Sequence, residues 1–436
     1  MRIVYLHQYF TTPGMTGGTR SYEIARRLVA RGHEVHMVTT DRDAAPGGRR
    51  GWSTAEVGGI RVHALPVPYS NRMSYARRIG AFVHFAIEAA REATRIGGDL
   101  VYATSTPLTI AIPAVRAARA HRIPMIFEVR DLWPEIPVAV GALRNPVLIA
   151  IARRLERFAY HNAAHVIALS DGMRDGVVAA GHPASRVTVI PNACDREMFD
   201  VGDGPGREIR ERYEWLGNRP MVVYTGTMGL INGVGYMVRI AAAAAAIDPD
   251  IRFVVVGDGR EADQVRSEAA TLGVLDRNFF LIPPVSKASM PAWLSAATIA
   301  TSFVIDKPAL WANSANKFFD ALAAARPIAV NYGGWQADVI NESGAGLVLD
   351  RQSPTAAAAQ LVRAVRDAAW LRNAGAAGRR LATERYDRDL LTDRLEDVFL
   401  RVVGGQNSAA AARVGATAAF RSLGDLPVSG LSAPGA

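Results

Sequence analysis

Short apolar runs alternate with segments of helical periodicity along most of the chain. Residues 2–10, 34–40 and 100–104 are apolar runs that follow or precede polar or glycine-containing loops, which is typical of buried strands. The intervening segment 21–30 places its apolar residues three and four positions apart, as an amphipathic helix does. Alternation of this kind predicts parallel sheets covered by helices, because a crossover helix returns the chain to the same end of the sheet.

The alternation is interrupted once, and the interruption divides the chain into two predicted domains. Residues 1–196 form the first α/β unit, the Gly- and Asp-rich segment 197–206 is predicted to be a loose linker, and residues 207–386 form the second unit. A last helix, 387–403, is expected to return toward the first domain, and the Gly-, Ala- and Ser-rich segment 404–436 is predicted to be a disordered tail. The predicted fold class is therefore α/β, with two doubly wound, parallel, Rossmann-like domains that face each other across a cleft.

The stretch 314–327 lies between two predicted strands of the second domain and predicts a helix. Phe318 and Leu322 fall on one face of that helix. Asn313 or Ser314 is expected to cap its N-terminus. This order places the start of the helix at the carboxyl edge of the sheet.

Three polar residues occupy the first turns of this helix: Asn316, Lys317 and Asp320. Such a helix start binds anions in many α/β proteins, because its free N–H groups and the helix dipole point outward. Lys317, expected to be exposed, supplies a cation for a phosphate, and Asp320 supplies an acceptor for sugar hydroxyls. The alternative is an ordinary amphipathic helix with a solvated polar start.

Two glycine-containing loops follow predicted strands. Gly17 and Gly18 precede the first helix, where they let the backbone approach a ligand closely. Gly257-Asp-Gly259 matches part of a dinucleotide-binding fingerprint in the second domain. A nicotinamide site also needs an acidic residue after the next strand, and Pro284 follows there instead, so a nicotinamide cofactor is disfavoured. The sequence predicts no cofactor.

Charged and aromatic residues crowd the end of one predicted strand of the first domain: Glu128, Arg130, Asp131 and Trp133. A carboxylate in this position suits substrate binding or base catalysis. The alternative is an Arg–Asp pair that stabilises a loop. His7 ends the first strand and is expected to reach the cleft, whereas the histidines as a group lack metal-ligand spacing, so no metal site is predicted.

The composition narrows the classes of partner. The chain has 436 residues, of which 49% are hydrophobic and 21% charged, so it is globular. Its net charge of +9 favours anionic partners, but no nucleic-acid-binding motif appears. The single cysteine, Cys194, excludes an internal disulfide and fits a cytoplasmic protein. No apolar run approaches the roughly 20 residues of a membrane span, and the first residues predict a strand rather than a signal peptide.

Taken in order, these segments resemble glycosyltransferase family 4, whose members are retaining enzymes of the GT-B fold. The resemblance covers nearly all of residues 1–400. Its motifs are Gly17-Gly18, Gly32-His-Glu-Val35, residues 128–134, Val189-Ile-Pro-Asn192, Tyr224-Thr-Gly-Thr-Met-Gly229, Val256-Gly-Asp-Gly259 and Asn316-Lys-Phe-Phe-Asp320. The forms Arg-Asp-Leu-Trp-Pro and Asn-Lys-Phe-Phe-Asp resemble the branch that contains bacterial N-acetylfucosamine transferases of surface-polysaccharide assembly.

The resemblance implies transfer of a sugar from a nucleotide diphosphate sugar, with UDP as the expected nucleotide, to an acceptor hydroxyl, with retention and without a metal ion. The implied donor-binding residues are Gly17, Gly18, Thr227, Gly257, Pro284, Val285, Asn316, Lys317 and Asp320. Among them, Gly17 and Gly18 would contact the diphosphate and Asp320 the ribose, while the backbone of residues 284–285 would frame the base. Asp131 and Lys317 would be catalytic, and His7, Arg130 and Trp133 would lie on the acceptor side.

Three positions depart from the family's pattern. The family has two glutamates, of which the second falls on the ribose-binding position Asp320 and the first falls on Ala312. The phosphate-binding arginine and lysine of an earlier loop fall on Thr227 and Asn232. Lys317 is the expected substitute cation, with Arg130 or Arg20 as alternatives. The incomplete set leaves two other functions open: a nucleotide-sugar 2-epimerase of the same fold, and a nucleotide-sugar-binding protein without catalysis.

The resemblance also implies an acceptor sugar linked to polyprenyl diphosphate, as used in polysaccharide or glycolipid assembly. A peripheral contact with the inner face of an anionic plasma membrane is therefore expected. The predicted helix 72–95 fits this contact, because it carries an apolar stripe from Tyr75 to Ile87 with arginines beside it. The alternative is that the stripe packs on the sheet as core.

Overall fold

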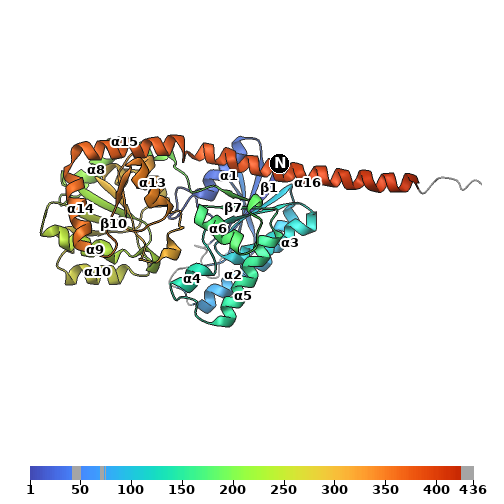
Figure 1. Cartoon of the computed structure of the whole chain (residues 1–436), viewed down its shortest axis with the longest axis horizontal. Coiled ribbons are helices and arrows are strands. Elements are labelled where there is room, and N and C mark those ends of the chain that lie inside the picture. The colour runs from blue at the N-terminus through green and yellow to red at the C-terminus, as the bar shows by residue number, and fades with distance from the viewer. Residues whose placement is uncertain (42–50, 69–72, 74, 424–436) are drawn as a thin grey trace, which may run out of the picture.

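The computed structural model describes residues 1–41, 51–68, 73 and 75–423. These residues form two α/β domains, and the last helix runs from the second domain across the first and beyond it (Figure 1). Both sheets are parallel and carry helices on both faces, apart from one antiparallel edge strand. The predicted fold class of two doubly wound parallel domains is confirmed.

The sheet of the first domain has 8 strands in the described part of the chain, in the order β3-β4-β2-β1-β5-β6-β7-β8. The strands are β1 Arg2–Leu6, β2 Glu34–Asp41, β3 Ser53–Val57, β4 Ile60–Pro66, β5 Leu100–Thr104, β6 Met125–Val129, β7 His165–Ala168 and β8 Val187–Val189. Neighbouring strands are parallel except β3 and β4. The carboxyl ends of the parallel strands therefore lie along one edge.

Helices cover both faces of this sheet because its central strands are buried on both sides. The helices of the domain are α1 Arg20–Ala30, α2 Tyr75–Ile96, α3 Ala111–His121, α4 Glu135–Ala139, α5 Pro146–Asn162, α6 Asp171–Ala179 and α7 Arg196–Phe199. Val4 and Leu6 of β1 pack with α2, α3 and α5. The alternating residues Ile3 and Tyr5 pack with α1 and with α16 (Arg388–Leu423).

The sheet of the second domain has 6 parallel strands among the described residues, in the order β11-β10-β9-β12-β13-β14. The strands are β9 Met221–Thr225, β10 Arg252–Val256, β11 Phe279–Ile282, β12 Ile299–Ser302, β13 Ile328–Val330 and β14 Gly346–Val348. The helices are α8 Gly204–Arg212, α9 Gly235–Ala245, α10 Ala262–Thr271, α11 Met290–Ala296, α12 Asn316–Ala323, α13 Trp335–Ser343, α14 Pro354–Arg366 and α15 Ala368–Glu384. Two hydrophobic clusters, one on each face of this sheet, hold the helices in place.

The chain passes between the domains twice, and the two passages are joined to each other. The backbone N–H of Cys194 donates to the carbonyl of Tyr386 at 2.7 Å. Arg388 forms an ion pair with Asp195, and both side chains are buried. Leu395 of α16 then enters the core of the first domain. The last helix is thereby anchored to both domains.

Helices occupy parts of two segments for which the sequence predicts none. Helices α7 and α8 occupy most of the predicted linker 197–206, and Pro205 lies in the first turn of α8, where its missing N–H costs nothing. Helix α16 continues to Leu423, whereas a disordered tail was predicted from residue 404. The tail sequence is rich in alanine, the residue with the highest helix propensity, so a helix can continue through it.

The predicted cap of α12 is wrong. The residue before the helix is Ala315, and no side chain of the described chain caps the helix start. The hydroxyl oxygen of Ser314 instead accepts from the backbone N–H of Asn192 at 3.1 Å, and the side-chain amide of Asn192 donates to the Ser314 carbonyl at 2.5 Å. Ser314 is used to bind the first domain to the start of α12 rather than to cap the helix.

The apolar stripe predicted on helix 72–95 divides into two groups. Phe85, Ala86 and Ala89 of α2 are buried in the core, whereas Ile79, Val83 and Ile87 are exposed. Arg72 lies outside the described residues. Within the described residues, no helix combines the length and apolar character needed to cross a membrane.

Candidate functional site

A cavity of about 520 Å³ lies between the two domains, at the carboxyl edges of their sheets. We call it the cleft cavity. Its lining includes every residue predicted to bind a donor, namely Gly17, Gly18, Thr227, Gly257, Pro284, Val285, Asn316, Lys317 and Asp320. It also includes residues that were not predicted, namely Thr16, Thr225, Gly226, Val256, Asp258, Gly259, Arg260, Lys287 and Met290.

The order of strands and helices explains why these distant residues meet. Residues 16–18 lie in the loop after β1, residues 225–227 close β9, residues 256–260 follow β10, and residues 284–285 follow β11. Each of these loops leaves the carboxyl end of a parallel strand, and the carboxyl ends share one edge of each sheet. The two edges face each other across the cleft cavity.

The loop after β1 is bonded directly to the second domain. The backbone N–H of Lys287 donates to the carbonyl of Met15 at 3.1 Å. A Cβ atom at Gly18 would lie 2.9 Å from the Nδ2 atom of Asn316, so only glycine fits there without movement of that side chain. Gly18 thus brings a main-chain segment of the first domain against the start of α12.

The glycines after β10 are explained by loop packing. A Cβ atom at Gly257 would lie 1.9 Å from the carbonyl oxygen of Gly226, and one at Gly259 would lie 2.3 Å from that of Met228. The loop after β10 therefore packs its backbone directly on the loop after β9. This packing accounts for the partial dinucleotide fingerprint without a dinucleotide.

Lys317 is half-buried, not exposed as predicted. Its Nζ atom lies 4.8 Å from the ring centre of Tyr224, a cation–π distance. Burial lowers the pKa of Lys317 to about 8, with the Asp320 carboxylate opposing this shift and the Lys287 cation adding to it. The cleft cavity thus holds an amine that is cationic at neutral pH and that gains from a nearby anion.

Asp320 is paired with a lysine that was not predicted. The Nζ atom of Lys287 donates to Oδ2 of Asp320 at 2.5 Å, and both side chains are almost completely buried. Burial raises the pKa of Asp320, and Lys287 opposes the rise. A lysine soon after β11 was visible in the sequence, but periodicity cannot indicate a contact between residues so far apart. A sugar hydroxyl at Asp320 would have to share its carboxylate with Lys287.

Arg20 cannot serve as the alternative phosphate ligand. Its Nη2 atom donates to Oε1 of Glu128 at 2.8 Å, and both side chains are fully buried. Tyr102 donates to the same oxygen at 2.7 Å. Burial would raise the pKa of Glu128, but the charges of Arg20 and Arg130 and hydrogen bonds to the carboxylate outweigh burial and lower it to about 2. Arg20 and Glu128 form a structural ion pair beneath the cleft.

The lining of the cleft cavity does not include Asp131 or the three residues expected on the acceptor side, His7, Arg130 and Trp133. A Cβ atom at Gly18 would lie 3.8 Å from Nη2 of Arg130, so this guanidinium lies close to the loop after β1. The other terminal nitrogen of Arg130 lies 3.5 Å from Nε2 of the buried His7. Trp133 is half-buried and packs against the core under α2, α3 and α5.

Asp131 is half-buried beside these residues. One of its carboxylate oxygens accepts a long hydrogen bond, 3.4 Å, from the hydroxyl of Thr106. Burial raises the pKa of Asp131, and the Arg130 cation and the Thr106 hydrogen bond oppose the rise. Because this hydrogen bond is long and therefore weak, the Asp131 carboxylate remains available to accept from a substrate hydroxyl.

Ala312, which replaces the expected glutamate, lies in the contact between the domains. The hydroxyl of Ser170 donates to the Ala312 carbonyl at 2.6 Å, and a Cβ atom at Gly172 would lie 2.8 Å from the Cβ of Ala312. Of the other two departures, Thr227 is exposed and lines the cleft cavity, whereas Asn232 accepts from the backbone of its own loop. The cations of the cavity lining are accordingly Lys317, Lys287 and Arg260. Among the described residues, no group of three or more His, Cys, Asp or Glu side chains is placed to hold a metal ion.

Two family models match the chain. A glycosyl transferase 4-like domain matches residues 16–193, and a glycosyl transferases group 1 domain matches residues 219–367. Together they cover most of the chain, and their boundary falls between the two observed domains.

Curated relatives and solved structures agree with these models. The chain is 28% identical over 209 residues to an alpha-D-kanosaminyltransferase of Streptomyces kanamyceticus. This match covers 48% of this chain and 49% of the relative, so it spans about half the length of each. It is 26% identical over 305 residues to an alpha-maltose-1-phosphate synthase of Mycolicibacterium smegmatis, and this match covers 66% of this chain and 75% of the relative.

The crystal structure of Anabaena HepE in complex with UDP and glucose has the same fold, with a TM-score of 0.67 at 16% identity. The likeness covers 92% of this chain and 99% of HepE. The predicted GT-B architecture is therefore confirmed, while the branch of N-acetylfucosamine transferases is not singled out by any of these matches. The first domain thus matches a glycosyl transferase 4-like family model, the second matches a glycosyl transferases group 1 model, and the chain as a whole has the GT-B fold.

Proposed function

We propose that the protein transfers a sugar from a UDP-sugar to an acceptor hydroxyl, with retention of the anomeric configuration and without a metal ion. The observation that carries the proposal is the cleft cavity of about 520 Å³, which combines main-chain glycines of one domain with Lys317 and Lys287 of the other. Its volume is in the range of small-molecule sites. A solved structure of the same fold contains UDP and glucose, which supports UDP as the nucleotide.

The diphosphate of the donor would lie between the loop after β1 and the start of α12. Gly17 and Gly18 would offer backbone N–H groups, and Lys317 would offer its ammonium group. Negative charge builds up on the leaving diphosphate as the sugar bond breaks, so groups held ready for that charge lower the barrier. The nearby Lys287 adds positive potential even though it is paired with Asp320.

The nucleoside would occupy the part of the cavity nearest β11. Pro284 and Val285 would frame the base, and Asp320 would accept from a ribose hydroxyl while Lys287 holds its carboxylate in place. This pairing restricts Asp320 to one orientation, which favours a precise contact over a flexible one.

The acceptor would approach from the side of Arg130 and Asp131. In a retaining enzyme of this kind the acceptor attacks on the face from which the diphosphate leaves, so the leaving group itself can take the proton. Asp131 would then orient the acceptor hydroxyl, and its raised pKa would ease the sharing of a proton.

The test is a transfer assay with purified protein and a panel of UDP-sugars, beginning with UDP-N-acetylfucosamine because of the resemblance to that branch. Release of UDP that depends on an acceptor supports a transferase. Conversion of the UDP-sugar without acceptor would instead support the 2-epimerase, and tight binding without turnover would support a binding protein. Retention predicts that the product has the anomeric configuration of the donor by nuclear magnetic resonance, and an inverted product refutes that part.

An exposed apolar surface supports an acceptor that is bound to a lipid. Its residues are Ile79, Val83 and Ile87 of α2, Ile112 of α3, and Val147, Leu148 and Ile151 of α5, all between 44% and 64% exposed. Helix α3 contacts both α2 and α5, so the three helices form one layer. We call this set the apolar surface.

The position and charge of the apolar surface suit a membrane next to the cleft. Helices α2, α3 and α5 follow strands of a parallel sheet, so their N-terminal parts lie toward the carboxyl edge, where the cleft cavity opens. Exposed arginines on the same helices include Arg77, Arg116, Arg153 and Arg154. A glycolipid or polysaccharide precursor in an anionic inner leaflet would then present its sugar to the cleft from this side.

A further inference from the structure

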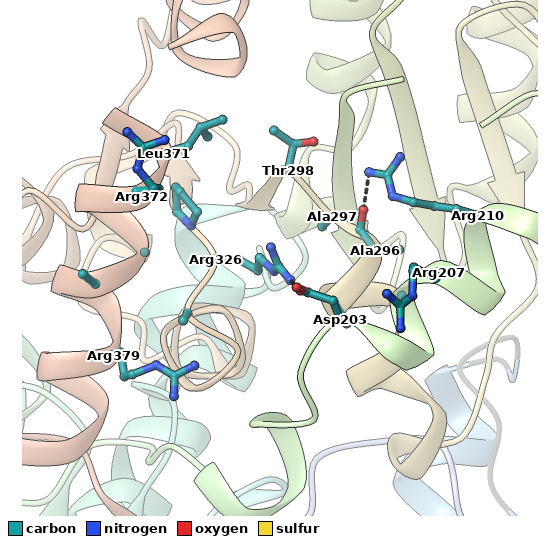
Figure 2. Close-up of a pocket in the computed structure, with 16 residues that line it drawn as sticks. Asp203, Arg207, Arg210, Ala296, Ala297, Thr298, Arg326, Leu371, Arg372 and Arg379 are labelled. Atoms are coloured by element: carbon teal, nitrogen blue, oxygen red, sulfur yellow. Dashed lines mark hydrogen bonds and ion pairs between the residues drawn. The ribbon is translucent and has the colours of Figure 1, made fainter. Parts of the chain in front are cut away.

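A second cavity, of about 620 Å³, lies at the opposite end of the second sheet from the cleft cavity. It opens at Thr298, just before β12, and at Pro327, just before β13, whereas the cleft cavity lies after the carboxyl ends of the strands. Helices α8 and α15 form its walls, and Figure 2 shows its charged side chains around one hollow. We call it the arginine cavity.

Five arginines line this cavity: Arg207, Arg210, Arg326, Arg372 and Arg379. Asp203 is the one carboxylate in the lining, and 83% of its side chain is exposed where it meets Arg326 at 3.3 Å. A second carboxylate, Asp200, pairs with Arg379 at 2.7 Å from outside the lining. The cavity therefore contains more positive charge than its own carboxylates neutralise.

The arginines also crowd one another. Arg210 donates to three backbone carbonyls, those of residues 217, 219 and 296, and to no carboxylate of the described chain. Burial and the neighbouring cation of Arg326 both lower the pKa of Arg210. The Nε atom of Arg326 is buried and finds no acceptor among the described residues. The two guanidinium cations, Arg210 and Arg326, repel each other, and a bound anion would offset this repulsion.

Two of the arginines are free to meet a ligand. Among the described residues, neither the Arg207 nor the Arg372 side chain has a hydrogen-bonding or ion-pair partner, and both residues are exposed. Arg207 lies on α8 and Arg372 on α15, so they approach the cavity from two walls. A planar guanidinium presents two parallel N–H donors that match the oxygens of a phosphate.

We propose that the arginine cavity binds a small metabolite that carries more than one phosphate or equivalent anionic group. Its volume suits a phosphorylated sugar or nucleotide better than the open, extended groove that a nucleic acid needs. The ligand would displace Asp203 from Arg326 and Asp200 from Arg379. Both aspartates belong to the segment that joins α7 to α8 between the domains, so the bound anion would loosen that connection. The proposal does not rest on the function of the cleft.

Pyrophosphate serves as the probe for anion binding in the arginine cavity, and the cleft cavity is first disabled so that it does not compete for the probe. The cleft is expected to bind a diphosphate as well, so binding is measured by calorimetry in a Lys317→Ala background at constant ionic strength. The proposal predicts that pyrophosphate still binds. It also predicts that Arg207→Gln together with Arg372→Gln weakens this binding by about tenfold or more, because two charge-assisted contacts are lost.

A matched control lies on the same two helices. Arg212 on α8 and Arg380 on α15 are exposed and are not among the cavity lining. Arg212→Gln with Arg380→Gln removes the same charge and is expected to leave the affinity unchanged. Equal weakening in both double variants, unchanged affinity in the first, or no binding at all in a Lys317→Ala protein with normal thermal unfolding would overturn the proposal.

Discussion

Lys317 places a half-buried amine in the lining of the cleft cavity. The ring of Tyr224 lies against its ammonium group, and Gly226 leaves space beside the end of the side chain. If the amine binds the donor diphosphate, Lys317→Ala removes a charge-assisted contact worth about 1.5–3 kcal/mol, which corresponds to roughly 10- to 150-fold in donor affinity. Calorimetric titration with UDP measures the change. Unchanged UDP affinity in a folded variant would return Lys317 to a packing role.

The lowered pKa of Lys317 predicts a pH dependence of donor binding. The amine is cationic below its pKa of about 8 and becomes neutral above it, so UDP affinity is expected to fall as the pH rises through about 8. Lys317→Arg supplies the control, since a guanidinium stays charged over the whole range. Titrations between about pH 7 and about pH 9.5 compare the two proteins. A profile that is the same in both would show that the titrating group lies elsewhere.

Asp131 is the residue of the acceptor side that carries a specific prediction. Asp131→Asn removes the charge but keeps the size of the side chain, and the amide oxygen can still accept the hydrogen bond from Thr106. We expect the rate of sugar transfer to fall at least about tenfold, as for loss of an acid–base or orienting carboxylate, while UDP affinity stays the same. Rate and affinity are measured separately for this reason. A transfer rate equal to that of the wild type would leave Asp131 as a loop-stabilising residue only.

Among the elements, the junction of α7 and α16 contains a buried ion pair. Asp195 and Arg388 each have only about 5% of their side chains exposed, and Arg388 also donates to the carbonyl of Ala193 at 3.0 Å. Arg388→Met would leave a buried carboxylate without its partner, which typically costs about 3–5 kcal/mol of unfolding free energy. Denaturant titration measures this cost.

An ion pair whose arginine is exposed provides the comparison for that measurement. Arg366 meets Asp248 at 2.7 Å with 50% of its side chain exposed. Arg366→Met is therefore expected to cost less than about 1 kcal/mol. If the two variants lose the same stability, the junction does not depend on the Asp195–Arg388 pair.

Elements with strong periodicity are those that the sequence predicts well. Strand β5 has the predicted boundaries, because residues 100–104 form an apolar run between loop signals. The edge strand β3 was not predicted, since three of its five residues are exposed and polar alternation is too short there to recognise. Capping at α12 was predicted wrongly because Ser314 has a competing partner in the other domain. Local signals decide local structure only where no distant group competes for the same atoms.

The same limit explains what was missed in the candidate site. The rule that ligands bind at the carboxyl ends of parallel strands, taken together with the family resemblance, predicted the segments that surround the cleft cavity. The pairs Lys287–Asp320 and Arg20–Glu128 join residues 33 and 108 positions apart, and no periodicity links them. These pairs nevertheless decide which cations remain available, and they remove Arg20 from the candidates.

At the scale of the whole molecule, the two domains are held in one arrangement from both ends of the cleft. The loop after β1 bonds to residues 287 and 288 at the donor side, and the α7–α16 junction closes the other side. The arginine cavity and the apolar surface lie away from these contacts between the domains, the cavity on the second domain and the surface on the first. A ligand or a membrane can therefore reach each of them without entering the cleft.

The apolar surface carries the last prediction, which concerns the molecule as a peripheral membrane protein. In vesicle flotation, the protein is expected to bind anionic vesicles, to bind neutral ones poorly, and to be released by salt. Arg77→Gln, Arg153→Gln and Arg154→Gln together are expected to weaken binding about 100-fold, since each basic residue near the surface adds about 1 kcal/mol. Ile79→Ser with Val83→Ser and Ile87→Ser should weaken it further through lost apolar burial.

Ile247→Ser with Leu272→Ser, which removes two exposed apolar residues of the second domain, is the control and should change nothing. Equal recovery with neutral and anionic vesicles, or normal binding by both triple variants, would contradict membrane contact at this surface and favour a soluble acceptor.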